Sequence, residues 1–163
     1  KYFYEKFNHN HKKCYCVRIY WILLLSDAFY MGAYMKNPEI SVIMGIYNCA
    51  DTLSEAIESV LGQTMSEWEL IMCDDGSSDA TSEVAEFYIK KYPERMVLLK
   101  NKENRGLNYT LNRCLKMATG KYIARMDGDD ICLPERFAVE YEILEKEKRQ
   151  MIERADVIRY GVF

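Results

Sequence analysis

The sequence predicts an α/β fold with a mostly parallel sheet and helices on both of its faces. From residue 39 onward, strand-like apolar runs alternate with helical patterns, which is the order of elements that such a sheet requires. The chain has 163 residues, about the length of one domain with its own core. Apolar residues make up 49% of it and charged residues 29%, an ordinary globular composition.

The predicted strands are short apolar runs. They cover residues 40–46, 68–73, 96–99 and 121–126. The first, ISVIMGI, is rich in β-branched residues, as in a strand that is covered on both faces. A helical pattern separates each strand from the next, so the strands are expected to run parallel.

The first two predicted helices have recognisable limits. In the first, Thr52 and Glu55 have the spacing of a capping box, and Gly62 fits its end. Its apolar face consists of Ala56, Ile57, Val60 and Leu61. The second helix is expected to end before Pro93. Its apolar face consists of Val84, Phe87 and Tyr88.

The third and fourth predicted helices flank the last strand. The third is expected to end at Gly120. Its apolar face consists of Leu107, Leu111, Cys114, Leu115 and Ala118. Pro134 suits the first turn of the fourth helix, where its missing N–H costs nothing. The charged stretch 140–154 is expected to be a solvated helix face.

Three regions divide the chain. Residues 1–38 form an N-terminal extension of unknown role, rich in aromatic residues and holding both histidines, which would either cover a sheet edge or touch a membrane surface. Residues 39–148 form the regular domain, and residues 149–163 form a tail. A zinc site is disfavoured in the extension, because its Cys14-x-Cys16 pair is closer than zinc-binding pairs usually are.

Charge and cysteine content narrow the range of expected partners and the expected cellular compartment. The net charge of −3 and the scattered basic residues argue against a nucleic-acid partner. The six cysteines have no disulfide-framework spacing, which predicts reduced thiols in a cytoplasmic protein. The longest clean apolar run, residues 19–25, is far shorter than a membrane span, so contact with the inner face of the membrane would be peripheral.

Polar sequences follow every predicted strand. Tyr47-Asn48 follows the first strand, Asp74-Asp75-Gly76-Ser77 the second, Asn104-Arg105-Gly106 lies in the loop after the third, and Asp127-Gly128-Asp129-Asp130 follows the fourth. In parallel sheets the ligand crevice lies beyond the carboxyl ends of the strands. The four loops are therefore expected to converge on one edge and form a binding site.

The acidic turn after the fourth strand suits a divalent cation. Two carboxylates about 5 Å apart repel by roughly 3 kcal/mol at an effective dielectric near 20, so the turn calls for a positive partner. Asp127 and Asp129, on alternate residues, could hold one ion that also binds phosphate oxygens. Gly128 would allow an unusual backbone angle or a close ligand. The alternative is a surface turn that caps the next helix, and Asp130 is expected to be such a cap or a hydrogen-bond partner for the loop.

The other polar residues also have two interpretations. Asp74 and Asp75 could form a turn before a helix capped by Ser78 or Asp79, or could accept hydrogen bonds from a base or a sugar hydroxyl. Tyr47 could be a core ring or a platform on which a nucleobase stacks. Arg105 could be a surface cation or could face a pyrophosphate.

Taken together, these segments resemble the nucleotide-sugar-binding half of family 2 glycosyltransferases. The resemblance extends from residue 40 to residue 145. The matching motifs, in family order, are SVIMGIYN, SVLGQT, WELIMCDDGSSDAT, NKENRGLNYTLNRCL and GKYIARMDGDDICLPERF. It is strongest to bacterial enzymes that build cell-surface polysaccharides, and it implies a Rossmann-like GT-A domain.

The resemblance implies a role for each site residue. Tyr47, followed by Asn48, resembles the residue that stacks on the donor base, and Asp75, with Asp74 beside it, resembles the residue that reads uracil. Asn104, Arg105 and Gly106 match the loop near the nucleotide. Asp127 and Asp129 match the DxD positions, which hold the ribose and a Mn²⁺ or Mg²⁺ ion on the diphosphate.

The implied activity is metal-dependent, inverting transfer of a sugar from a nucleoside-diphosphate sugar, most simply a UDP-sugar. The acceptor would be a glycan or a lipid-linked molecule. The metal would neutralise the departing nucleoside diphosphate.

Two departures from the family pattern stand out. Gly45 replaces a proline that the family usually has, which is expected to loosen that loop. No residue matches the general base, which the family's later half supplies, and the segment KEKRQMIERADVIRYGVF matches nothing in the family. The chain is therefore expected to be truncated, and a non-catalytic nucleotide-sugar-binding remnant remains the alternative.

Unrelated acidic-pocket folds fit less well. A phosphoacceptor receiver or a dehalogenase-like phosphatase would carry its acidic pair after the first strand. Here the first strand ends in Tyr47-Asn48, and the Asp-Gly-Asp sequence follows the fourth.

Overall fold

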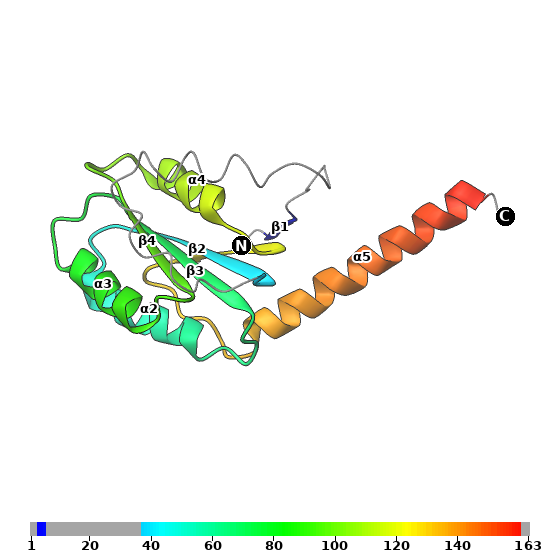
Figure 1. The fold of residues 1–163 in the computed structure, drawn as a ribbon, viewed down its shortest axis with the longest axis horizontal. Coiled ribbons are helices and arrows are strands. Elements are labelled where there is room, and N and C mark those ends of the chain that lie inside the picture. Colours follow the sequence, from blue (N-terminus) through cyan, green and yellow to red (C-terminus); the bar gives the residue numbers. More distant parts are fainter. Residues whose placement is uncertain (1–2, 6–36, 161–163) are drawn as a thin grey trace.

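The computed structural model describes residues 3–5 and 37–160, and these form one α/β body with a projecting helix (Figure 1). The extension that the sequence sets apart, including its histidines and the Cys14–Cys16 pair, lies outside the described residues apart from strand β1 (Phe3–Glu5) and residues 37–38.

The sheet has the predicted strands in the predicted orientation. They are β2 (Ile40–Ile46), β3 (Trp68–Asp74), β4 (Met96–Lys100) and β5 (Tyr122–Asp127). The order across the sheet is β1-β5-β2-β3-β4, and all neighbours are parallel except β1, which pairs antiparallel with β5. The α/β prediction and the mostly parallel sheet are confirmed.

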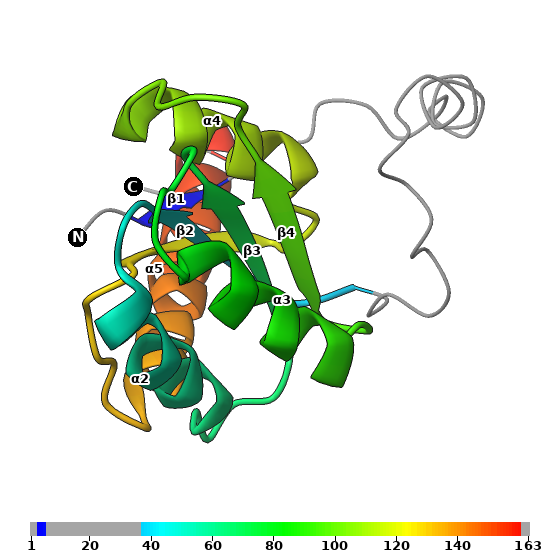
Figure 2. The same ribbon diagram turned by 90° about the vertical axis from the view of Figure 1, so that its left-hand side faces the viewer.

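Helices cover both faces of the sheet (Figure 2). On one face lie α2 (Ala50–Leu61) and α3 (Thr81–Lys91), and on the other lies α4 (Leu107–Met117). Even-numbered strand residues such as Ile40, Val42 and Leu70 belong to the larger apolar cluster on the α2–α3 face. Odd-numbered ones such as Ile43 and Ile71 belong to a second cluster with Cys114 of α4. The two clusters explain why both alternating sets of strand residues are apolar.

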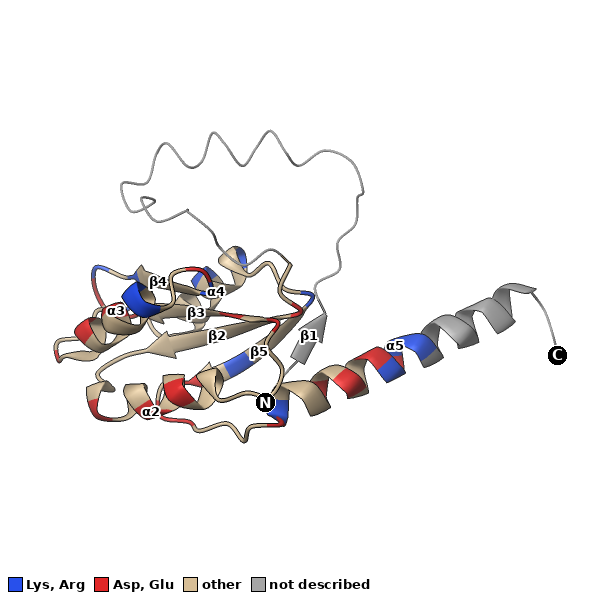
Figure 3. Ribbon diagram, turned by 60° about the horizontal axis from the view of Figure 1, so that its bottom comes forward, with Lys and Arg blue, Asp and Glu red and all other residues tan. Residues whose placement is uncertain are grey.

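Helix α5 (Arg136–Tyr160) begins beside α2 and extends away from the body (Figures 1 and 3). Its first turns are attached: Phe137 is fully buried, and the Tyr141 ring lies 5.8 Å from the Tyr122 ring. Glu145 accepts a hydrogen bond from the Tyr122 hydroxyl at 2.6 Å and pairs with Lys121. From residue 140 to residue 149 its side chains are partly or fully exposed, as expected of a solvated face, and the helix passes residue 148 without a break.

Several expected helix limits are wrong. Helix α2 begins at Ala50, and its N-cap, Cys49, makes no side-chain capping bond, so Thr52 and Glu55 form no capping box. Helix α4 ends at Met117, three residues before Gly120. Pro134 lies two residues ahead of α5 rather than in its first turn. Phe87 is 61% exposed, and Ala85 takes its place in the core.

Gly120 has a different function from the one expected. A Cβ there would lie 2.6 Å from the main-chain nitrogen of Ser41, so only glycine fits. Its N–H donates to the Ser41 hydroxyl at 2.7 Å. The fully buried Glu69 accepts hydrogen bonds from Ser41 and, at 2.7 Å, from the N–H of Thr119. This polar cluster ties the start of β5 to β2 and β3, at the end of the sheet away from the candidate site.

Candidate functional site

The polar strand ends do meet at one edge of the sheet. In the parallel register Ile46 pairs with Asp74, Asp74 with Lys100, and Gly45 with Asp127. The loops after β2, β3, β4 and β5 therefore leave the sheet at the same level, as the sequence predicts.

Asp75 holds the loop that precedes α4. Its carboxylate is 4% exposed and accepts hydrogen bonds from the side chain of Asn101 at 2.6 Å and from the N–H groups of Arg105 and Gly106, both at 2.8 Å. Burial alone would raise the pKa of Asp75, but the bonds from Arg105, Asn101 and Gly106 outweigh it and lower that pKa below its ordinary value. Asp75 thus stays ionised and fixes the loop of residues 104–106.

Two glycines allow these loops to approach each other. Gly76 has φ +75°, and a Cβ on it would lie 2.8 Å from the carbonyl carbon of Glu103. Gly106 has φ +84° and precedes the first residue of α4. Because other residues rarely adopt this left-handed backbone, glycine is required at both positions.

Tyr47, Asn48 and Asp74 lie where β2 and β3 end. The Tyr47 side chain is 48% exposed, so it is a surface ring and not a core ring. Asn48, with φ +46°, accepts a hydrogen bond from the N–H of Ser78 at 2.9 Å and donates its own N–H to the Ser77 hydroxyl at 3.0 Å. Asp74 accepts from the hydroxyl of Ser77 at 2.6 Å. These bonds join the loop after β2 to the loop after β3.

Side chains that follow β3 in the chain accept hydrogen bonds from the first N–H groups of helix α2. The N–H of Cys49 donates to the Thr81 hydroxyl at 2.8 Å, and the N–H of Ala50 donates to Asp79 at 3.2 Å. Asp79 also accepts from the N–H of Thr81 at 3.0 Å, but the N-cap of α3 is Ala80, so the prediction of a cap at Ser78 or Asp79 is wrong. Side chains from another part of the chain thus bind N–H groups at the start of α2.

The acidic turn lies against the start of α2. The N–H of Asp130 donates to the Asp127 carbonyl at 3.2 Å and closes the turn, and Asp129 at its tip is exposed. Gly128 has no left-handed φ and leaves no room for a ligand: a Cβ there would lie 2.8 Å from the sulfur of Cys49. The Thr52 hydroxyl donates to the Gly128 carbonyl at 3.0 Å. The glycine therefore serves packing, which corrects both expected roles.

Arg125 is the positive partner of the turn. Its guanidinium lies 3.0 and 3.1 Å from the two carboxylate oxygens of Asp127. Sequence reasoning missed Arg125, although its position two residues before Asp127 places both side chains on one face of β5. Within the described residues, no group of three or more side chains could hold a metal ion. A metal at this turn would have Asp127 and Asp129 as its protein ligands, and their hard oxygens suit Mg²⁺ or Mn²⁺ completed by phosphate.

Asn104 and Arg105 lie at the rim. Asn104 accepts from the N–H of Gly106 at 3.1 Å. The Arg105 side chain is 52% exposed, pairs with Glu103 at 3.3 Å, and lies over the Tyr109 ring at 4.9 Å from its centre. Its guanidinium is thus held near the edge of the sheet yet open to solvent.

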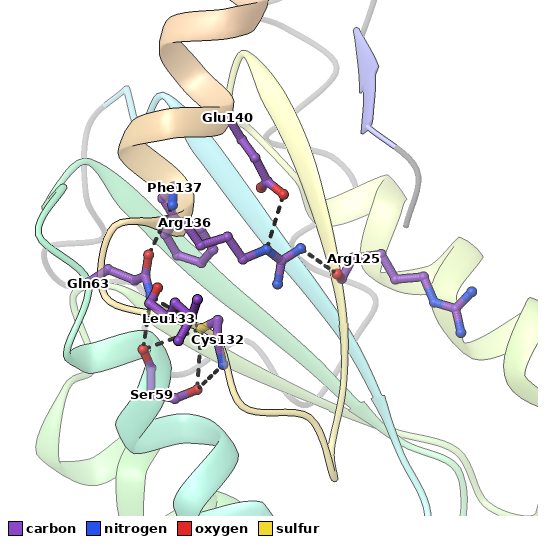
Figure 4. A network of polar contacts seen from close by, with 8 residues as sticks. All are labelled: Ser59, Gln63, Arg125, Cys132, Leu133, Arg136, Phe137 and Glu140. Carbon is purple, nitrogen blue, oxygen red and sulfur yellow. Dashed lines mark hydrogen bonds and ion pairs between the residues drawn. The ribbon is translucent and has the colours of Figure 1, made fainter.

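The segment after the acidic turn is attached to the end of α2 (Figure 4). Gln63, 8% exposed, donates to the Leu133 carbonyl at 2.7 Å and accepts from the N–H of Phe137 at 3.0 Å. Arg136 donates to the Arg125 carbonyl at 3.1 Å. Sequence reasoning also missed Gln63, because a glutamine after a helix is normally expected at the surface.

Comparison with known proteins identifies the family. The family model described as "Glycosyl transferase family 2" matches residues 41–157. The chain belongs to this family. The match starts at β2 and runs nine residues past the expected boundary at 148, into the stretch of α5 that the sequence alone did not assign to the family.

Curated relatives are similar over part of their length. EpsE of Bacillus subtilis (strain 168), named as a glycosyltransferase, is 46% identical over 78% of this chain and 46% of its own length. WfgD of Escherichia coli, named as a UDP-Glc:α-D-GlcNAc-diphosphoundecaprenol β-1,3-glucosyltransferase, is 40% identical over 69% of this chain and 43% of its own length. The chain thus spans somewhat under half the length of these family 2 relatives.

Solved structures of glycosyltransferases share the fold. TarS of S. aureus superposes with a TM-score of 0.61 and 26% identity, over 66% of this chain and 20% of that chain. A mannosyltransferase of Pyrobaculum calidifontis has a TM-score of 0.55 and 24% identity, over 71% of this chain and 34% of that chain. The expected GT-A fold is confirmed.

Proposed function

We propose that the edge formed by the ends of β2, β3, β4 and β5 binds a nucleoside-diphosphate sugar, and that the whole protein transfers the sugar to a growing cell-surface polysaccharide. The observation that carries the proposal is the convergence of an exposed ring, an ordered glycine loop and an acidic turn at one edge of a family 2 domain.

Uridine is the proposed base. Tyr47 would stack on it, because its ring is half exposed and aromatic faces bind any base. Asn48 would set the position of that ring, since its hydrogen bonds fix the chain directly after it. TarS has been solved in complex with UDP and with UDP-GlcNAc, which supports the choice.

Asp74 and Asp75 would shape the base pocket in different ways. Asp75 would act mainly by holding the loop of Asn104, Arg105 and Gly106 beside the nucleotide, since this loop already occupies its carboxylate. Asp74, which accepts from Ser77, would hold the opposite loop. The exposed guanidinium of Arg105 would face the diphosphate.

Asp127 and Asp129 would hold Mn²⁺ or Mg²⁺ on the diphosphate. When bound, such a metal neutralises the charge that develops on the departing nucleoside diphosphate. Asp127 would exchange its ion pair with Arg125 for the metal and the ribose, while the exposed Asp129 would reach the metal from the tip of the turn.

The acceptor would be a glycan or a lipid-linked glycan, and transfer would invert the anomeric carbon. WfgD is named for a lipid-linked acceptor, which supports this choice. The site would then work at the inner face of the membrane. No helix in the described part of the chain has the length and apolar character needed to cross a bilayer.

Titration calorimetry with UDP in the presence and absence of MnCl₂ tests the donor site. Binding is expected to require the metal and to weaken at least about tenfold in Asp129→Ala, because one of two protein ligands is lost. Asp130→Ala is the matched control and should bind as the unaltered chain does. Metal-independent binding, or equal affinity of both variants, would overturn the proposal. A hydrolysis assay with UDP-glucose and UDP-GlcNAc would then separate an active enzyme from a binding remnant.

A further inference from the structure

A cavity lies on the α4 face of the sheet, and Arg125, the partner of Asp127 in the acidic turn, lines it. Its volume is about 370 Å³, within the range of small-molecule sites. The apolar part of its lining includes Ile43, Leu111 and Ile123, and the polar part consists of Asn108, Asn112 and Arg125. None of its lining residues is aromatic or acidic.

The fold brings the polar groups of this cavity together. Asn108 and Asn112 are four residues apart on α4, so their amides lie on the same side of the helix. Arg125 is the register partner of Ile43 in the neighbouring strand, and its side chain is on the same face of β5 as that of Ile123. Two carboxamides and one guanidinium therefore surround an apolar floor.

This combination suits a sugar ring. A pyranose has an apolar C–H face, which packs on aliphatic side chains, and a rim of hydroxyls, which both donate and accept hydrogen bonds. Carboxamides offer donors and acceptors together, and a guanidinium offers several donors. A nucleobase suits the cavity less well, because the lining offers no ring on which it could stack.

Arg125 joins this cavity to the proposed donor site. Its guanidinium lines the cavity and lies 3.0 Å from an oxygen of Asp127. A sugar in the cavity would thus be one side chain away from the diphosphate that Asp127 is proposed to hold. The proposed base-binding loops leave the sheet at the ends of β2, β3 and β4, and none of their residues lines the cavity.

We infer that the cavity lined by Asn108, Asn112 and Arg125 binds a pyranose of the acceptor glycan. This inference rests on the proposed function. The two amides would hydrogen-bond to the ring hydroxyls, and Arg125 would position the ring beside the reacting group. α4 would then serve both substrates, with its preceding loop at the donor and its side chains at the acceptor.

Methyl ¹H–¹³C NMR tests the inference on the whole chain. The probe is methyl N-acetyl-α-D-glucosaminide, a neutral pyranoside with no affinity for the metal, added to protein saturated with UDP and MgCl₂. The methyl signals of Ile43 and Ile123 should shift and reach saturation. Asn108→Leu and Asn112→Leu should each weaken binding, and together by at least about tenfold, because the hydrogen bonds to the ring are lost. Leucine favours the helix more than asparagine does, so the fold should persist.

Lys116→Gln is the matched control, since Lys116 is exposed on α4 but does not line this cavity, and it should leave the affinity unchanged. Absent shifts at Ile43 and Ile123, or unchanged affinity in the double variant, would overturn the inference. Displacement of the probe by UDP-GlcNAc but not by UDP would also overturn it, because the cavity would then take the donor sugar. UDP binding in the same samples reports separately on the proposed function.

Discussion

Asp75 shows how one buried carboxylate can organise a binding edge. It directly follows strand β3, and its oxygens accept hydrogen bonds from the N–H groups of the loop that leads into α4. A residue of this kind contributes to ligand binding through the loop that it holds in place. The sequence allowed two roles for it, a turn or a base contact, and the structure gives its carboxylate a third set of partners.

Acid should weaken the fold through Asp75. Its pKa is lowered in the folded chain, so its contribution to stability is fully present above the ordinary value near 4 and is lost as the pH falls through the lowered value. Urea unfolding at pH 7 and pH 3 should show that Asp75→Asn loses less stability on acidification than the unaltered chain. At pH 7 the variant should be less stable by about 1–3 kcal/mol, because its amide nitrogen cannot accept a hydrogen bond.

Thr52→Val serves as a check on local effects, since it removes a different loop bond, to the Gly128 carbonyl at 3.0 Å, without touching a titrating carboxylate. Its loss of stability should be the same at both pH values. If Asp75→Asn and the unaltered chain respond equally to acid, the ionised Asp75 does not stabilise the loop.

Close packing around Gly128 determines how much stability a substitution at this position would cost. Gly128→Ala should destabilise the chain by about 1–3 kcal/mol, because the new Cβ would lie 2.8 Å from the Cys49 sulfur. Cys49→Ala in the same chain should restore much of that loss by removing the sulfur. Thermal unfolding of the single and double variants measures the coupling between the two sites. Gly62→Ala, where the nearest atom would be 3.4 Å away, is the control. Additive effects of the two substitutions would show that the turn does not pack on Cys49.

At the scale of elements, α5 depends on one glutamine for its starting position. Gln63 binds both the carbonyl of Leu133 and the N–H of Phe137, so it connects the end of α2 to the segment that enters α5 (Figure 4). Because the acidic turn lies between β5 and this segment, the same bonds also limit how far the turn can move.

Gln63→Leu should loosen the start of α5 while leaving the sheet intact. The buried N–H of Phe137 would lose its partner, at a cost of about 1–3 kcal/mol, and the Leu133 carbonyl would lose its bond from Gln63. Hydrogen exchange should accelerate at the amide of Phe137 but not in β3, whose residues are all buried. Thr64→Ala, which removes a longer 3.3 Å bond to the Pro134 carbonyl, is the matched control and should change exchange little. Equal exchange at Phe137 in both variants would contradict the anchoring role.

For the whole molecule, the sequence predicted the architecture better than it predicted local detail. The apolar runs and their alternation determine which segments are strands, and parallel pairing then brings the loops to one edge. Helix limits were predicted wrongly where hydrogen bonds to distant residues replace a local capping motif. Asp79 and Thr81 accept hydrogen bonds from the first N–H groups of α2, so the helix needs no capping box. The pairing of Arg125 with Asp127 follows from their two-residue spacing on one strand, whereas the burial of Gln63 and Glu69 depends on contacts between distant segments. A sequence read one element at a time does not reveal such contacts.

The residues of the larger apolar cluster and several residues of the proposed binding sites lie on opposite faces of the sheet. Asp75, Arg125 and Asp127 all occupy odd-numbered positions of their strands or directly follow them, on the side of α4, whereas Val42, Leu70 and Met126 pack on the side of α2 and α3. Random mutagenesis confined to α2, α3 and the even-numbered strand positions other than Asp74 could therefore search for heat-resistant variants of this domain without altering any group that the proposed ligands would touch.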